Sequence, residues 1–139
     1  MRASRIQVLF AAAAAVALVV ASAAPAHARA AIAGPGAFAT GFATPVVVTS
    51  PGGQVTLFSS DVAPHNFVAS DTFLTKKQAK KAEWCTSYAR GKCPLFWSPT
   101  IAAGEQADVM GLEYVESGTQ YAFFCSLHPS SMRGTLVVN

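Results

Sequence analysis

The segment YAFFCSLHPSSMRG, from Tyr121 to Gly134, carries three side chains that can bind a soft metal ion. Cys125 supplies a thiolate, His128 an imidazole and Met132 a thioether, all within eight residues. A soft sulfur, a nitrogen and a second, weaker sulfur together suit copper better than zinc or a hard cation. One such segment does not complete a trigonal site, so a second imidazole has to come from elsewhere in the chain.

The first residues have the features of a secretory signal peptide. Residues 1–28 contain Arg2 and Arg5, then an apolar block, then small residues that end in the sequence AHA. The apolar block is short for a membrane span, and the final three residues fit the A-x-A cleavage rule. We therefore predict export to the periplasm or cell exterior through a Sec-type signal, with no transmembrane segment after cleavage.

Two histidines remain after the predicted cleavage, His65 and His128. A site with two imidazoles and one thiolate must use both of them. Taken alone, a histidine at the start of a strand is more often a surface or capping residue, and a lone methionine is usually a packing residue. The order of His65, Cys125, His128 and Met132 along one chain is what favours a metal site.

Length and charge limit the classes of protein. Roughly 110 residues remain after cleavage, enough for one domain but not for two. The 139-residue chain has a formal net charge of +3. Loss of Arg2 and Arg5 would lower that charge to about +1. No basic stripe interleaved with aromatic residues is present, so we expect no nucleic-acid partner.

The chain has three cysteines. In an oxidising compartment an odd number leaves one thiol free or bonded to another chain. If Cys125 is a ligand, Cys85 and Cys93 remain as a disulfide pair. Their spacing differs from the C-x-x-C pattern of thiol oxidoreductases, which favours a structural bridge over a redox-active pair.

Short β-branched or alternating segments between turn signals predict a β-sandwich. Residues 29–44 are rich in Ala, Gly and Thr and are predicted to be a flexible leader, and residues 45–139 the folded domain. Strands or β-like segments are predicted at 46–49, 54–59, 65–70, 95–98, 107–115, 119–125 and 134–139.

Residues 71–94 differ in character from the rest of the domain. No Pro or Gly occurs between Leu74 and Arg90, and Thr75 and Gly91 can serve as N-cap and C-terminal stop, which predicts a helix. The segment thus reads as a short helical insertion held by a disulfide. Its lysines could dock an acidic redox partner or form an ordinary solvated face, and both interpretations stay open.

The sequence Pro64-His65-Asn66, followed by Cys125-x-x-His128-Pro129-x-x-Met132, resembles the ligand motif of the type 1 (blue) copper proteins. These are the cupredoxins of the plastocyanin, pseudoazurin and amicyanin group. The resemblance covers residues 45–139, with 71–94 as an insertion. It implies an all-β Greek-key sandwich and one copper ion as cofactor.

The same resemblance implies roles for single residues. His65, Cys125 and His128 would form the equatorial plane around copper, with Met132 as the weak axial ligand. Asn66 would orient the ligand loop and donate a backbone hydrogen bond toward the thiolate, and Pro129 lies beside the second histidine. Three residues separate His128 from Met132, between the two of amicyanin-like loops and the four of plastocyanin-like loops.

The resemblance implies a carrier of single electrons between redox partner proteins, and the signal peptide implies that it is secreted. We expect a monomer, and no enzyme, because no further histidines remain for a second metal centre. Two alternatives remain open at this stage. The same ligands could sequester or deliver copper outside the cytoplasm, or the sandwich could be a metal-free interaction module. A nucleophilic Cys125–His128 pair is disfavoured, because no oxyanion arrangement is evident.

Overall fold

The computed structural model describes residues 29–87 and 92–139. The predicted signal peptide, residues 1–28, and the predicted helix stop at Gly91 lie outside these ranges. The described strands are β1 (Ala30–Ala33), β2 (Val46–Thr49), β3 (Thr56–Ser59), β4 (Val68–Ala69), β5 (Gln106–Asp108), β6 (Gln120–Phe124) and β7 (Arg133–Val138). The described helices are α1 (Ala37–Thr40), α2 (Lys76–Ala79) and the 3₁₀ turns η1 (Glu83–Ser87) and η2 (Leu112–Tyr114).

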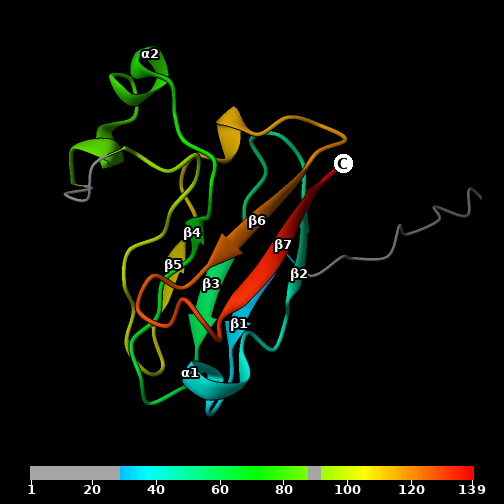
Figure 1. Cartoon of the computed structure of the whole chain (residues 1–139), viewed down its shortest axis with the longest axis vertical. Coiled ribbons are helices and arrows are strands. Elements are labelled where there is room, and N and C mark those ends of the chain that lie inside the picture. Colours follow the sequence, from blue (N-terminus) through cyan, green and yellow to red (C-terminus); the bar gives the residue numbers. More distant parts are fainter. Residues whose placement is uncertain (1–28, 88–91) are drawn as a thin grey trace, which may run out of the picture.

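The strands form two mixed sheets, with the orders β1-β3-β5 and β2-β7-β6-β4. The chain changes sheet at each step from β1 to β6, and only β6 and β7 follow one another as an antiparallel pair in the same sheet. The predicted all-β sandwich is confirmed. Figure 1 shows the sheets along the long axis of the molecule, with α1 at one end and α2 at the other.

A cluster of aromatic rings fills the interior next to β6. The ring of Phe67 stacks on that of Phe123 with centroids 4.0 Å apart, and Phe42 packs edge-on against Phe123 at 5.2 Å. Gly134 of β7 permits this packing, because a Cβ there would lie 2.3 Å from Cζ of Phe123. The core thus fixes the end of β6, which leads directly into the CSLH segment.

The prediction that residues 29–44 form a flexible leader is wrong. They contain β1, which pairs in parallel with β3, and α1. Ala31, Ala33 and Ala37 are buried, and Phe42 belongs to the core. Alanine is depleted in strands, so the composition of this segment did not indicate β1. The folded domain therefore begins near residue 30, not at residue 45.

Several element predictions were too long. The strand expected over 65–70 is only β4, and the β-like segment expected over 95–98 contributes only isolated bridges at Trp97. The strand expected over 107–115 is only β5, because Gly111 adopts a left-handed φ of 93° and starts the turn η2. The helix expected from Thr75 is a single turn, α2, followed by η1. Its predicted start is correct: Thr75 and Gln78 form a capping box. Lysines four residues apart repel one another, which disfavours a longer helix.

The insertion is stapled as predicted by a disulfide between Cys85 and Cys93. Cys125 is the free, buried thiol. Within the described ranges, the chain has no helix with the length and apolar character needed to cross a bilayer.

Candidate metal centre

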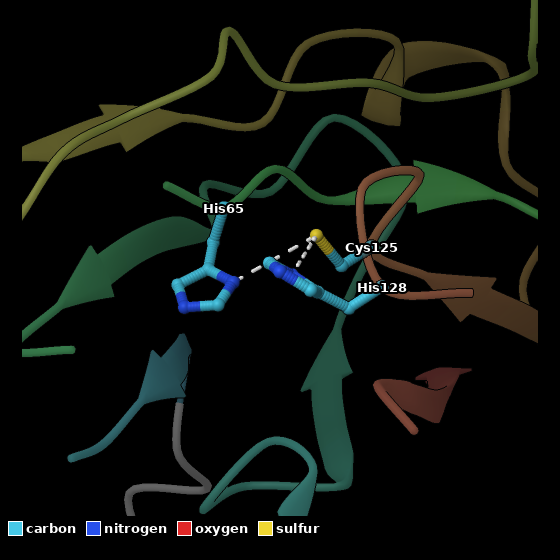
Figure 2. Close-up of side chains that lie close together, drawn as sticks. All are labelled: His65, Cys125 and His128. Atoms are coloured by element: carbon cyan, nitrogen blue, oxygen red, sulfur yellow. Dashed lines mark hydrogen bonds between the residues drawn. The ribbon is translucent and has the colours of Figure 1, made fainter. Parts of the chain in front are cut away.

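His65, Cys125 and His128 come together in one cluster, although the first lies 60 residues from the thiol. Their potential ligand atoms all lie within 4.8 Å of one another. Figure 2 shows both imidazoles turned toward the sulfur. His65 and Cys125 are fully buried, and His128 is partly exposed. The sequence-predicted trio is thus a real spatial group with one member at the surface.

The spacing of the trio fits a trigonal metal ion. With zinc-type bond lengths of about 2.0–2.1 Å to nitrogen and about 2.3 Å to sulfur, such an ion sets nitrogen and sulfur about 3.8 Å apart. The observed Sγ to Nδ1 distances are 3.8 Å for His65 and 3.7 Å for His128. Two imidazoles and one thiolate are the donors of blue-copper sites. The side chains are therefore already arranged for copper.

The backbone positions the loop that carries two of these groups. Cys125 follows β6 directly, and its N–H donates to the carbonyl of Met132 at 3.0 Å, which extends the β6–β7 pairing. The N–H of His128 donates to the carbonyl of Cys125, and that of Met132 to the carbonyl of His128. The segment is thus a closed turn that holds the sulfur and the imidazole on one side.

Asn66 ties the first histidine to this loop. Its backbone N–H donates to Sγ of Cys125 at 3.5 Å. Its side chain donates to Oγ of Ser126 and accepts from the Ser126 N–H, both at 2.8 Å. Because Asn66 is adjacent to His65, these bonds set the position of His65 relative to the thiol.

The other predicted site residues are less directly involved. Met132 is fully buried in the turn that Cys125 opens. Pro129 is exposed, and its carbonyl accepts a hydrogen bond from Nε of Arg133. Pro129 thus holds the loop through its backbone.

Asp61 is a site residue that sequence reasoning missed. Its carboxylate is buried and accepts a hydrogen bond of 2.8 Å from Nε2 of His65. Burial acts to raise the pKa of this carboxyl. The hydrogen bond from His65 and three bonds from backbone N–H groups outweigh that effect and lower the pKa to about 2. Its position four residues before His65 was only a weak sign of a contact between the two side chains. The burial that makes this contact important cannot be read from the sequence.

The N-terminal segment closes one side of the cluster. The ring of Phe38 in α1 lies 6.3 Å from that of His128, and Oγ of Ser131 donates to the carbonyl of Phe38 at 2.6 Å. Gly36 and Phe38 also donate backbone hydrogen bonds to Asp61. The residues predicted to be a leader are therefore part of the site.

Comparisons with solved structures agree with this fold. A purple cupredoxin from Nitrosopumilus maritimus is similar at 20% identity, with a TM-score of 0.54, and the match covers 79% of this chain and 98% of that one. An azurin from Methylomonas sp. strain J is similar at 18% identity, with a TM-score of 0.52, covering 79% and 95%. No curated protein sequence matches significantly.

A family profile matches far more of the sequence than its ligand motif alone. The profile describes copper binding proteins of the plastocyanin/azurin family and covers residues 31–139. This match begins inside β1, in agreement with the ordered N-terminal segment. The chain therefore belongs to the plastocyanin/azurin family of copper-binding proteins.

Proposed function

We propose that this protein is an extracytoplasmic, mononuclear type 1 copper protein that carries single electrons between redox partners. The observation that carries the proposal is the His65–Cys125–His128 cluster, whose two nitrogen–sulfur distances match a trigonal ion. In this proposal these three residues would hold the copper ion, and Met132 would supply a fourth, weaker sulfur ligand. A site of this kind tolerates both copper(I) and copper(II), and so supports one-electron transfer.

The chain's own residues hold this site rigid and dry. Two of the three ligands are fully buried, and Cys125 belongs to the same buried core cluster as Phe123. The Asn66 side chain is bonded in both directions to Ser126, so the His65 and Cys125 segments move as one unit. A rigid donor set changes little between oxidation states, which favours fast electron exchange.

Electrons would enter and leave at His128. It is the partly exposed member of the trio, and the exposed side chains of Phe38 and Leu127 lie beside it, one in ring contact and one adjacent in sequence. An exposed apolar rim around a ligand suits brief contact with a partner protein. The proposal includes no substrate chemistry for this chain.

The burial of the ligands also favours a carrier over a delivery protein. Release of copper would require the acceptor to reach Cys125, which has no exposed surface, or the closed loop to open. Rapid, reversible electrochemistry without copper loss would support the carrier. Ready transfer of copper(I) to a chelating acceptor would instead support delivery.

The proposed compartment rests on two features. The first is the Cys85–Cys93 disulfide, because disulfides form and persist in oxidising compartments outside the cytoplasm. The first 28 residues have the pattern of an export signal. Mass spectrometry of the protein from its native host would test cleavage after Ala28.

The decisive test is the optical spectrum of the folded domain after addition of one equivalent of copper(II). We expect an intense visible band from thiolate-to-copper charge transfer, which Cys125→Ser abolishes. His65→Ala should also remove it, because the trigonal set is then incomplete. A colourless wild-type protein, or a band that survives Cys125→Ser, would refute the proposal.

A further inference from the structure

Asp61 is unusual among the acidic residues of this chain. It has 1% of its surface exposed, whereas the other six Asp and Glu residues, all within the described ranges, are exposed. Among the described residues, no lysine or arginine forms an ion pair with it. A buried carboxylate is costly unless hydrogen bonds and a nearby positive charge compensate it.

Four donors surround this carboxylate, and all are uncharged when His65 is neutral. One is the ring Nε2 of His65, at 2.8 Å. The other three are backbone N–H groups, those of Gly36 at 3.0 Å, Phe38 at 3.1 Å and Val62 at 2.9 Å. Hydrogen bonds are thus complete, but the protein itself supplies no compensating cation within this set. The missing positive charge would come from the metal centre.

The bond from His65 also fixes which nitrogen can bind the metal. A neutral imidazole carries one proton, and a carboxylate acceptor at Nε2 holds that proton there. Nδ1, which faces the thiol at 3.8 Å, is then left with its lone pair free. Carboxylate partners of this kind orient histidine ligands and make them stronger donors.

The two histidines of the cluster differ in this respect. Both present Nδ1 to the sulfur of Cys125. Among the described residues, only the ring of His65 has a carboxylate partner, and the ring of His128 contacts the rings of Phe38 and His65 instead. The histidine at the surface can therefore serve electron exchange, and the buried one can set the electronic character of the site.

We propose that Asp61 is a positioning residue that fixes His65 as an Nδ1 ligand and lowers the reduction potential of the copper centre. The inference rests on the proposed function. Copper(II) with one thiolate has one excess positive charge, which the Asp61 carboxylate neutralises. Copper(I) with one thiolate has none, so the same carboxylate leaves a buried negative charge. Asp61 therefore stabilises the oxidised form more than the reduced form.

The test compares the reduction potentials of the wild-type protein and Asp61→Asn, measured by spectroelectrochemistry. Loss of such a partner typically weakens metal binding by about 10–100-fold. If this loss falls on copper(II), the potential should rise by about 59 mV for each tenfold change. Copper(II) affinity should fall correspondingly more than copper(I) affinity.

Two control variants test whether loss of any carboxylate, or a looser N-terminal segment, is enough to raise the reduction potential. Asp108→Asn makes the same chemical change on an exposed carboxylate of β5, and should leave the potential unchanged. Thr44→Val removes the side-chain bonds to Ile32 and Ala30 that hold β1, and tests whether a looser N-terminal segment is enough. An unchanged potential in Asp61→Asn, or an equal rise in Thr44→Val, would overturn the inference.

A second measurement needs no variant, in case Asp61→Asn does not fold. In the wild-type protein loaded with copper(I), nitrogen-15 NMR should show a proton on Nε2 of His65 that exchanges slowly with water. A proton on Nδ1, or fast exchange at Nε2, would contradict the assigned role. A wild-type protein that lacks the thiolate-to-copper band would instead refute the proposed function itself, so the two failures are distinguishable.

Discussion

The two ends of the molecule are held together in different ways. At the copper end, three separate stretches of chain meet: residues 36–38, 61–66 and 125–132. At the other end, the two arms of the insertion, residues 71–94, pair with each other, and Leu74, Ala82 and Cys93 anchor it to the hydrophobic core. Leu74 donates to the carbonyl of Cys93 there, and the disulfide closes the loop.

The two ends also differ in how their buried polar groups are hydrogen-bonded. At the copper end the buried Asp61 carboxylate has four donors. In the insertion, Nε1 of Trp84 is buried without a hydrogen-bond partner among the described residues, although its ring stacks on Trp97. Buried polar groups are normally paired. Among the described residues, the buried carboxylate at the copper end follows this rule, whereas the indole nitrogen in the insertion does not.

The largest expected difference between the two ends is the loss of stability when the disulfide of the insertion is removed. The Cys85→Ser/Cys93→Ser double variant opens a loop with a sequence separation of 8. The chain-entropy relation gives a loss of about 2–3 kcal/mol in the free energy of unfolding. We expect denaturant melts to show this loss, while the thiolate-to-copper band keeps its position and intensity.

That result would show that the insertion stabilises the domain without shaping the site. A control is the wild-type protein under mild reduction, which should lose stability to a similar extent. A shift of the visible band in the double variant would contradict the separation of the two ends.

A second prediction concerns the copper end alone. Met132→Leu conserves volume at a fully buried position, so we expect less than about 1.5 kcal/mol of destabilisation. If Met132 is the axial ligand, replacing its sulfur with hydrocarbon should shift the visible band and raise the reduction potential. Met110→Leu, a change on the segment that pairs with Trp97, is the matched control and should do neither. Identical spectra for both variants would remove Met132 from the ligand set.

The ligand cluster was predictable because it depends on residue types that are rare in this chain. Only two histidines follow the predicted signal, and Cys125, His128 and Met132 are adjacent in one turn. The strands β2, β3, β6 and β7 lie at predicted positions, because β-branched or alternating residues lie there between turn signals. The strands depend on local sequence patterns, and the small number of histidines leaves few possible ligand sets.

The errors arose where tertiary packing overrides local composition. Residues 29–44 have the composition of a linker, yet Ala31 and Ala33 are buried beside β3 and Phe42 enters the core. Asp61 was not predicted as a site residue, because nothing in its sequence neighbourhood reveals that Gly36 and Phe38 donate hydrogen bonds to it. Contacts between distant segments create both the order of the leader and the burial of the carboxylate.

The smallest expected effect concerns the four lysines of the insertion, at positions 76, 77, 80 and 81. They are exposed and lie at α2, at the far end of the long axis from α1. Electrostatic effects in solution are screened beyond about 8 Å at physiological ionic strength. If electrons pass through His128, replacing all four lysines with glutamine should change the rate of oxidation by hexacyanoferrate(III) by less than about twofold.

The positive control places one charge at the other end. Ser130→Asp puts a carboxylate in the exposed loop two residues from His128, where it should repel the anionic oxidant and slow the reaction more than the loss of four lysines. Stopped-flow absorbance of the copper band at two salt concentrations measures both variants. If the lysine variant is the slower of the two, and if salt abolishes the difference, the insertion contributes to electron entry. In that case the two ends do not divide stability and chemistry between them.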